Sequence, residues 1–290
     1  RWAVPQANQA DTERALFDVG GSLVRWRPHA SGMSFGRAVA IDEFGFRDLG
    51  TGPAAASESW LLLGDSVTFG VGVDAPATFA GRLQAAHPSV KIWNTAVVGY
   101  SLEDYADVLQ DFLRTHPPPT RVLLFLCLND PMDRQRLNPE TESPLERALG
   151  FLRRNSRLYI VAKGELTDRS RSYWRHDLAY YDSANPYFNR AVDLLGRIHE
   201  RLTHAGVPLV VIVLPYEYQL RDPTAQNRLP QRMLAEQFAR LHIPVIDLYD
   251  AFAAHVGPAG DLFLYRDPMH LSAAGHALVF DELTRSLASP

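Results

Sequence analysis

The sequence has few of the features that mark several large classes of protein. It contains one cysteine among 290 residues, which excludes an internal disulfide and a four-cysteine zinc site. No apolar run approaches the roughly 20 residues of a transmembrane helix, and no signal peptide is visible. The net charge is -4, whereas a positive charge favours binding to nucleic acids. What is present, 46% hydrophobic and 21% charged residues, is typical of a globular chain with a large core.

From Trp60 onward, short apolar runs alternate with segments of helical spacing. The runs predicted to be strands are Trp60–Leu63, Val90–Trp93, Val122–Leu128, Pro208–Leu214 and Pro244–Ile246. The predicted helices are Phe79–Ala86, Leu102–Thr115, Phe188–Ala205, Met233–Leu241 and Leu271–Leu287. This alternation predicts βαβ units, and therefore an α/β fold in which helices cover both faces of a parallel sheet.

Two stretches lie outside this pattern. Residues 1–57 predict an N-terminal extension of short strands and loops, in which the runs Leu23–Arg27 and Ala38–Ile41 can pair. Residues 58–290 would form the main domain. About eighty residues separate its third and fourth strands, although a crossover needs only a dozen or more. We therefore predict an insertion over 131–187, with a helix over Leu145–Ala162, that is placed to form a lid or pocket wall.

Some side chains in these stretches have two open interpretations. Aromatic residues crowd the end of the insertion, where they can stack on a sugar or pack the insertion against the main domain. Basic residues of the N-terminal extension can approach an anionic substrate or lie on the surface as solvated charge. The latter are Arg25, Arg27, His29 and Arg47. The lone Cys127 lies inside an apolar run and is predicted to be a small buried side chain.

Ser66 follows the first predicted strand, in the tight turn Gly64-Asp65-Ser66. The carboxyl end of such a strand lies at the edge of the sheet where open α/β folds bind ligands. The hydroxyl is therefore a candidate nucleophile. Serine is also a favoured residue at a helix start, so the turn alone leaves a helix cap as an equal alternative.

A candidate base and its partner lie just before the last predicted helix, in Asp267-Pro268-Met269-His270. A nucleophilic serine needs a base beside its hydroxyl and a third group that orients the base. A separation of three residues in a turn lets Asp267 reach the near ring nitrogen of His270 and leaves the other nitrogen for Ser66. His276 falls within the helix and is predicted to be structural.

Two further loops at the same edge can supply donors for an oxyanion. Gly99 follows the second strand, where the absence of a side chain lets a backbone N–H approach a substrate. Asn129 follows the third strand and can donate from its amide. A glycine at a helix start and an Asn-Asp turn are the alternative interpretations.

Taken together, these residues resemble the GDSL/SGNH hydrolase superfamily. The four blocks occur in order as Gly64-Asp65-Ser66, Gly99, Asn129-Asp130 and Asp267-x-x-His270, and they span roughly residues 58–288. One departure is Cys127, where the third block of the family often has glycine. The resemblance implies a three-layer α/β/α sandwich around a flavodoxin-like, five-stranded parallel sheet. It also implies that no metal or organic cofactor is needed.

The same resemblance assigns roles to the site residues. It implies a catalytic triad of Ser66, His270 and Asp267, with an oxyanion hole made by the N–H groups of Ser66 and Gly99 and the side chain of Asn129. Five further residues near these blocks are predicted to contact substrate. They are Asp65, Tyr100, Asp130, Trp174 and Met269.

A weaker similarity concerns the substrate and the location. Gly45-Phe46-Arg47 ahead of the Gly64-Asp65-Ser66 block, with a long insertion after Asn129-Asp130, is similar to exported enzymes that edit acyl groups on bacterial surface glycans. Because the chain begins at Arg1 rather than Met, an export signal or membrane anchor ahead of it is compatible with this similarity. We expect a periplasmic or extracellular protein, with a cytoplasmic location as the open alternative.

Three functions are compatible with these residues. The first is a serine esterase or deacetylase that cleaves a short acyl ester, on a small molecule or a glycan, through an acyl-enzyme. The second is an O-acyltransferase that passes the same acyl group to a sugar hydroxyl. The third is a glycan-binding module with an idle triad. The sequence predicts no nucleic-acid partner and leaves the oligomeric state open.

Overall fold

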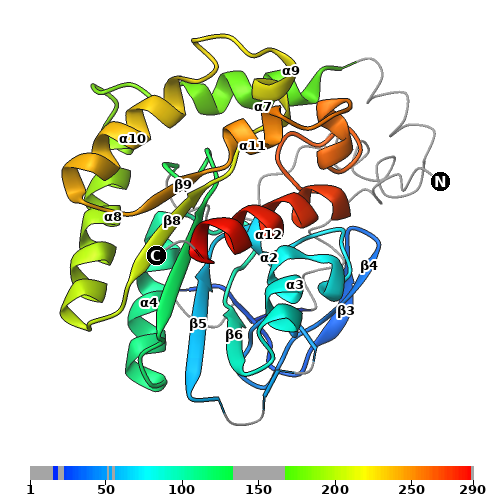
Figure 1. Cartoon of the computed structure of the whole chain (residues 1–290), viewed down its shortest axis with the longest axis vertical. Helices are drawn as coiled ribbons and strands as arrows, with labels where there is room; N and C mark the ends of the chain where they lie inside the picture. Colours follow the sequence, from blue (N-terminus) through cyan, green and yellow to red (C-terminus); the bar gives the residue numbers. More distant parts are fainter. Residues whose placement is uncertain (1–15, 19–22, 51, 54–55, 133–166, 289–290) are drawn as a thin grey trace, which may run out of the picture.

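The fold is built on one parallel sheet of five strands (Figure 1). The structure is a computed structural model, which describes residues 16–18, 23–50, 52–53, 56–132 and 167–288. The strands are β5 (Glu58–Leu63), β6 (Val90–Asn94), β7 (Arg121–Leu126), β8 (Leu209–Val213) and β9 (Val245–Asp247). Their spatial order is β6-β5-β7-β8-β9, with parallel pairing throughout. This is the flavodoxin-like order, so the predicted fold class is confirmed.

The central strands β5 and β7 are apolar because both faces of the sheet are covered. Leu61 and Leu62 are fully buried, as are the side chains of Val122 to Phe125. β7 ends at Leu126, two residues earlier than predicted, because the next four residues form a turn. In that turn the N–H of Asp130 donates to the carbonyl of Cys127, and the Asp130 carboxylate accepts from the Cys127 N–H. Cys127 is buried, as predicted.

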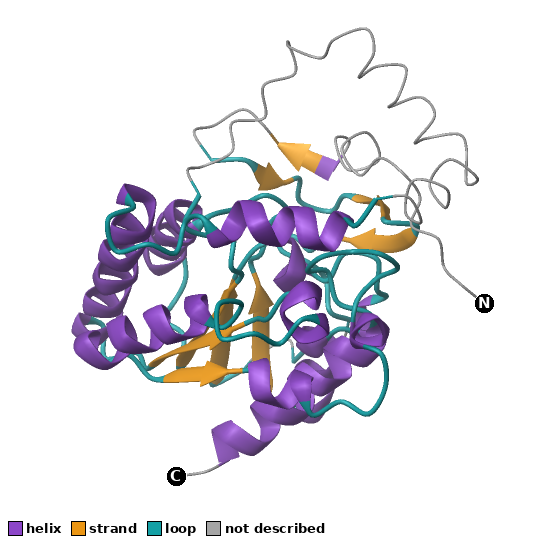
Figure 2. Ribbon diagram, turned by 90° about the horizontal axis from the view of Figure 1, so that it is seen from above, coloured by secondary structure: helices purple, strands orange, loops and turns teal. Residues whose placement is uncertain are grey.

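Helices cover the two faces of the sheet (Figure 2). On one face α3 (Phe79–Ala86) packs against α12 (Ala273–Ala288). On the other face α4 (Leu102–Thr115) packs against α8 (Pro186–His204), and Gly196 of α8 faces Leu241 of α10 (Leu229–Leu241). The bounds of α3 and α4 are those that the sequence predicts.

The described chain has six further helical elements. They are α2 (Ser66–Phe69), η2 (Ala75–Ala77), α7 (Arg169–Leu178), α9 (Glu217–Arg221), α11 (Tyr249–Ala253) and η3 (Ala259–Leu262). None of the helices in the described part of the chain combines the length and the apolar character needed to span a membrane.

His276 links the two helices α3 and α12. Its Nδ1 accepts a hydrogen bond of 3.2 Å from the N–H of Phe79, the first residue of α3. Burial lowers the pKa of His276 to about 3, so the ring is neutral at physiological pH. The ring therefore has the structural contacts that its place within the helix predicts.

The N-terminal residues form two small antiparallel pairs. β1 (Phe17–Asp18) pairs with β2 (Arg25–Trp26), and β3 (Ser31–Ser34) pairs with β4 (Arg37–Ala40). The predicted pairing of Leu23–Arg27 with Ala38–Ile41 is therefore wrong. A two-residue turn after Ser34 closes β3 and β4 on each other, so β4 is already paired with its neighbour in the chain.

Trp26 attaches this extension to the main domain. Its side chain is 1% exposed and stacks on Phe69, with ring centroids 4.5 Å apart. Its indole N–H donates a hydrogen bond of 2.9 Å to the carbonyl of Ala96. The N-terminal extension and the main domain thus share buried contacts. The boundary between them at residues 57 and 58 remains a prediction.

Of the insertion, the structure describes the first two residues, 131–132, and the end from residue 167, where α7 leads into α8 (Figure 1). The helix predicted over Leu145–Ala162 lies outside the described residues, and a role as a lid remains a prediction. Among the aromatic residues of the described part, Trp174 and Tyr181 are buried, whereas Tyr173 and Tyr187 are 44% and 38% exposed. Packing therefore accounts for the first two.

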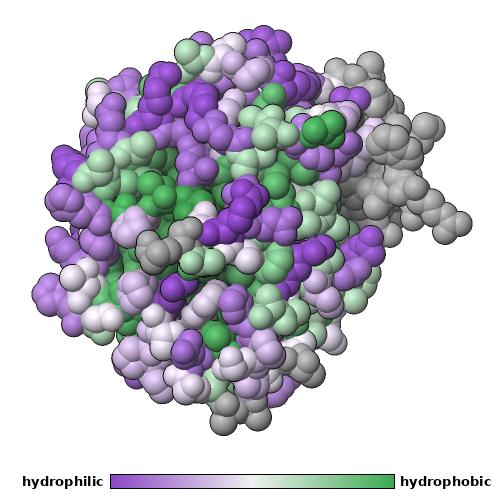
Figure 3. Space-filling model, viewed as in Figure 1, coloured by the Kyte–Doolittle hydropathy of each residue, from purple (hydrophilic) through white to green (hydrophobic). Residues whose placement is uncertain are grey.

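One face of the molecule carries apolar atoms over the β8 and β9 side of the sheet (Figure 3). β9 is an edge strand of three residues, and its Val245 is 39% exposed. Around this area the surface is mostly hydrophilic (Figure 3).

Candidate active site

Ser66 lies where β5 turns into α2, at the carboxyl end of the sheet. Asp65 caps this short helix, because its carboxylate accepts a hydrogen bond of 2.9 Å from the N–H of Val67. Gly64 makes the turn possible, since a Cβ placed on it would lie 2.0 Å from Oγ1 of Thr68. Ser66 is therefore the first residue of the helix rather than its cap, and its hydroxyl is not used for capping.

His270 lies in the loop between η3 and α12, and backbone hydrogen bonds hold this loop at both sides. The N–H of Leu264 donates to the carbonyl of His270 at 2.8 Å. The N–H of Glu217, at the start of α9, donates to the carbonyl of Pro268 at 2.9 Å. Asp267 closes the turn from within, because one carboxylate oxygen accepts from the N–H groups of Met269 and His270. The loop is thus fixed to the segment that follows β8.

A chain of hydrogen bonds joins Ser66, His270 and Asp267. Oγ of Ser66 lies 2.8 Å from Nε2 of His270, and Nδ1 of His270 lies 2.9 Å from Oδ1 of Asp267. With the ring proton on Nδ1 donated to the carboxylate, Nε2 is free to accept the proton of the serine hydroxyl. The structure therefore places Ser66 beside His270, although 204 positions separate these two residues in the sequence.

The electrostatics of the pair suit a base held by a carboxylate. Burial acts to lower the pKa of His270, but the charge and hydrogen bond of Asp267 act the other way and leave the pKa above its ordinary 6.5. Burial acts to raise the pKa of Asp267, but the His270 ring and its hydrogen bonds hold that pKa below its ordinary 3.8. Asp267 is thus ionised at neutral pH and favours the protonated form of His270.

The three predicted oxyanion donors follow neighbouring strands. The pairing of β5 with β6 and β7 places the ends of these strands side by side, and Ser66, Gly99 and Asn129 come shortly after them. Gly99 has φ of +83° in a turn closed by the N–H of Tyr100 and the carbonyl of Val97. Oδ1 of Asn129 is buried and has no hydrogen-bond partner among the described residues. The amide of Asn129 is therefore not held by a bond through that oxygen.

The five residues predicted to contact substrate are all buried, each at most 7% exposed. Asp65 caps α2, and the pKa of its carboxyl is raised by burial. Asp130 accepts hydrogen bonds of 2.9 Å from the Tyr105 hydroxyl and the Cys127 N–H. Tyr100 donates its hydroxyl proton to the carbonyl of Val24. Met269 lies in the His270 loop. Asp65, Tyr100 and Asp130 therefore form hydrogen bonds within the protein that stabilise the fold. Substrate contact by any of the five residues remains a prediction.

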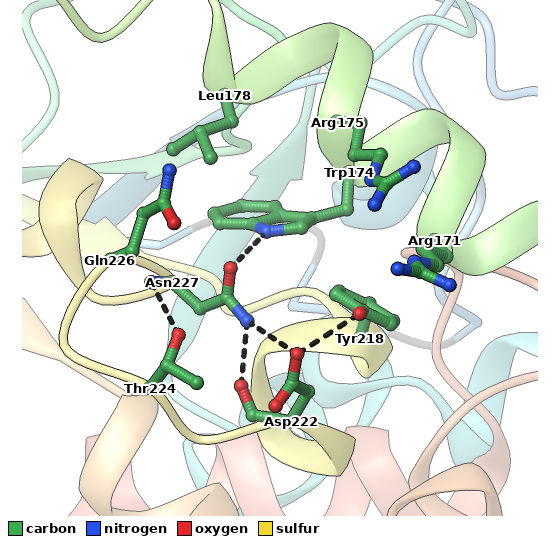
Figure 4. Close-up of a pocket in the computed structure, with 9 residues that line it drawn as sticks. All are labelled: Arg171, Trp174, Arg175, Leu178, Tyr218, Asp222, Thr224, Gln226 and Asn227. Carbon is green, nitrogen blue, oxygen red and sulfur yellow. Dashed lines mark hydrogen bonds between the residues drawn. The ribbon is translucent and has the colours of Figure 1, made fainter.

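Trp174 is one of the residues that line a small pocket, and it is not an open stacking surface (Figure 4). Its side chain is 1% exposed, and its indole N–H donates a hydrogen bond of 2.7 Å to Asn227. Asn227 in turn donates to Asp222, which also accepts from the Tyr218 hydroxyl (Figure 4). The pocket has a volume of about 260 Å³. Through its hydrogen bond to Asn227, Trp174 joins α7 to the segment after α9.

Two residues of the N-terminal extension, Arg47 and Phe35, contact parts of the site, and neither contact was predicted from the sequence. Arg47 is 2% exposed, so it is neither a surface charge nor in an open position for an anionic substrate. Its guanidinium donates to backbone carbonyls of the loop after α2. The Phe35 ring contacts the His270 ring, with centroids 5.3 Å apart. Two features of the sequence could have pointed to these residues. They are the Gly45-Phe46-Arg47 segment for Arg47 and the pair Phe35-Gly36 between two short strands for Phe35.

No group of three or more His, Cys, Asp or Glu side chains in the described part of the chain is arranged to hold a metal ion.

Comparison with known proteins identifies the family. The sequence profile of the GDSL-like lipase/acylhydrolase family matches residues 62–278, well over half of the chain. The protein therefore belongs to the GDSL-like lipase/acylhydrolase family, whose members are hydrolases of the esterase type. The comparison with curated proteins found no match.

Two of the solved structures that the chain matches, each with a TM-score of 0.50, share the fold. An acetyl-xylooligosaccharide esterase, Axe2 from a Geobacillus species, is 15% identical, with a TM-score of 0.50, and the match covers 81% of this chain and 96% of that one. TesA is 12% identical, with a TM-score of 0.50 and coverage of 80% and 98%. A lipase/acylhydrolase from Enterococcus faecalis is 18% identical, with a TM-score of 0.47 and coverage of 79% and 95%. At these identities the likeness concerns the fold alone.

Proposed function

We propose that this protein is a serine esterase that removes a short acyl group, with acetyl as the first candidate, from an alcohol. The observation that carries the proposal is the hydrogen-bond chain from Oγ of Ser66 through His270 to Asp267, at 2.8 and 2.9 Å. Its occurrence in a member of an acylhydrolase family supports the same reaction class. The raised pKa of His270 suits a group that must take up a proton and release it again.

Acylation begins when Oγ of Ser66 bonds to the ester carbonyl carbon and its proton passes to Nε2 of His270. The carbonyl oxygen becomes an oxyanion, for which the N–H groups of Ser66 and Gly99 and the amide of Asn129 are the proposed donors. The bond to the alcohol oxygen then breaks, and that oxygen takes the proton from His270. The acyl group remains on Ser66 as an ester.

Deacylation repeats these steps with water. His270 takes a proton from a water molecule as the water oxygen bonds to the acyl carbon. The bond to Oγ of Ser66 then breaks, Oγ recovers the proton from His270, and the carboxylic acid leaves. Asp267 stays ionised throughout and stabilises the protonated ring.

The alcohol that we propose is a sugar hydroxyl. Support for it comes from the order of the motifs, with Gly45-Phe46-Arg47 ahead of the Ser66 block and a long insertion after Asn129-Asp130. The same similarity supports export from the cytoplasm. Transfer of the acyl group to a sugar hydroxyl uses the same acyl-enzyme, so the two reactions differ only in what accepts the acyl group.

A panel of acyl esters, from acetyl upward, tests the proposal. We expect hydrolysis by the wild-type protein and covalent labelling of Ser66 by a serine-reactive phosphonate. Ser66→Ala should lower kcat on the order of 10⁴-fold or more and abolish the labelling. Ser89→Ala is the matched control, because Ser89 is exposed in the turn before β6. Wild-type rates in Ser66→Ala would contradict the proposal, and glycan binding without labelling would favour an idle site.

A second arm separates hydrolysis from transfer. The protein is incubated with an acetyl ester in the presence and absence of a glycan acceptor. Free acetate as the product in both cases supports the esterase. Faster turnover with acetylated glycan as the product would instead assign the protein as an O-acyltransferase.

A further inference from the structure

Phe35 adopts a backbone conformation that aromatic residues rarely adopt. Residues Ser34 and Arg37 are paired in the β3–β4 hairpin, so Phe35 and Gly36 form its two-residue turn. Their φ angles are +46° and +76°. A turn with two positive φ angles favours Asn or Gly at its first position, because a Cβ crowds the backbone there. The presence of Phe at this position is therefore not explained by the turn.

The Phe35 side chain lies against the candidate base. Its ring is half-buried, and its centroid is 5.3 Å from that of the His270 ring, with the planes tilted by 55°. Next to it, the backbone of Gly72 packs closely, since a Cβ placed there would lie 3.3 Å from Cβ of Phe35 and 2.7 Å from Leu264. The His270 side chain is left only 12% exposed. The hairpin turn thus covers part of the imidazole.

The hairpin contacts the loop that follows Ser66 and its helix. Arg37, directly after the turn, forms an ion pair of 3.0 Å with Asp74. Val39 of β4 is 5% exposed, and Gly32 of β3 packs against the buried side chain of Leu16. The hairpin lies ahead of the family match, which begins at residue 62. A part of the chain outside the family profile therefore contributes a side chain to the candidate site.

The mechanism decides which part of a substrate this ring borders. His270 must give its proton to the oxygen of the leaving alcohol, so that oxygen lies beside Nε2 of the ring. The acyl carbon, in contrast, is bound to Ser66. The Phe35 ring packs on the imidazole, so it lies nearer to the alcohol part of the ester than to the acyl part.

We propose that Phe35 is a specificity-determining residue that borders the leaving alcohol of the ester. Its aromatic ring selects for an alcohol with an apolar face that can lie against it, such as the C–H face of a sugar ring. The choice of acyl chain is left to other residues. The inference rests on the proposed esterase function and on the contact between Phe35 and His270.

Two ester series with Phe35→Asn test this inference. The first series keeps the acetyl group and varies the alcohol, with ethyl acetate and an acetylated xylo-oligosaccharide as probes. The second keeps p-nitrophenol and varies the acyl group from acetyl to hexanoyl. We expect the ratio of kcat/KM for the sugar ester over ethyl acetate to fall about tenfold in Phe35→Asn, while the acyl-chain ratios stay within about twofold. Met33→Ala, on the exposed side of the same hairpin, should change neither ratio.

Thermal melting separates specificity from packing. Asn suits the left-handed turn, so the melting temperature of Phe35→Asn should equal or exceed that of the wild type. A lower melting temperature with an unchanged alcohol ratio would overturn the proposal and assign the ring to packing. A shift in the acyl-chain ratios with no change in the alcohol ratio would also overturn it. Absence of ester turnover and of Ser66 labelling in the wild type would overturn the proposed function, and this inference with it.

Discussion

The buried guanidinium of Arg47 donates a hydrogen bond of 2.7 Å to the carbonyl of Gly70, the residue that ends the helix beginning at Ser66. Its other terminal nitrogen donates to the carbonyl of Val73 at 2.6 Å. Burial lowers the pKa of Arg47 to about 10, so it remains charged at neutral pH. One side chain of the N-terminal extension thus fixes the loop that follows the candidate nucleophile.

Replacing this guanidinium should destabilise the protein. In Arg47→Met the carbonyl of Val73 loses its donor inside the protein, and the carbonyl of Gly70 keeps only the N–H of Val73 at 3.3 Å. We therefore expect the free energy of unfolding to fall by about 2–4 kcal/mol. Arg37→Met is the control, since Arg37 forms an exposed ion pair with Asp74 that should contribute about 1 kcal/mol or less. Urea denaturation measures both changes. Equal losses in the two variants would contradict the anchoring role of Arg47.

The rate of ester hydrolysis should fall on the acid side through the pKa of His270. Only the neutral ring can accept the serine proton, so activity decreases as the pH falls through that pKa. Because Asp267 raises the pKa, the midpoint of kcat/KM should lie above 6.5. A pH profile measured from about pH 5 to 9 checks this. A midpoint below 6.5 would indicate that burial outweighs the carboxylate.

Asp267→Asn removes the charge that raises the pKa of His270. The midpoint of the acid limb should move to lower pH, because burial then acts without opposition from the carboxylate. We also expect kcat to fall on the order of 10²–10⁴-fold, since the amide does not hold the ring in the required tautomer. The exposed Asp261→Asn serves as the control. An unchanged pH profile in Asp267→Asn would rule out its proposed role.

Asn129→Ala distinguishes an oxyanion donor from a structural amide. Since Oδ1 of Asn129 has no partner among the described residues, we expect a loss of stability of at most about 1 kcal/mol. The loss of kcat should be about 10²–10³-fold if the amide donates to the oxyanion.

Asn94 provides the opposite case at the end of β6. Its amide donates to the carbonyl of Thr68 and accepts from the N–H of Ala96. Asn94→Ala should therefore lower the free energy of unfolding by about 1–3 kcal/mol. Chemical denaturation and steady-state kinetics of both variants test the contrast. A stability loss in Asn129→Ala as large as that in Asn94→Ala, with normal kcat, would contradict a donor role for Asn129.

The regular elements and the local turn could be predicted from the sequence. The bounds of Phe79–Ala86 and Leu102–Thr115 were confirmed, because helical spacing and end signals act over a few residues. The Asp267–His270 hydrogen bond likewise spans only three residues in one turn. The parallel sheet followed from alternating strands and helices, which place the turns after successive strands at a single edge.

The sequence by itself thus determined the five strands of the sheet, the helices α3 and α4 and the polar turns after the strands, since neighbouring residues set these. Only the tertiary structure decided that Arg47 is buried, that Trp174 is enclosed, and that β4 pairs with β3. It also decided that Phe35 covers His270. Each of these depends on the path of the chain through space, because burial and contact are set by residues far away in the sequence. For this reason an exposed arginine and a buried one look alike in sequence, and the residue beside a candidate base can come from a segment outside the family's motifs.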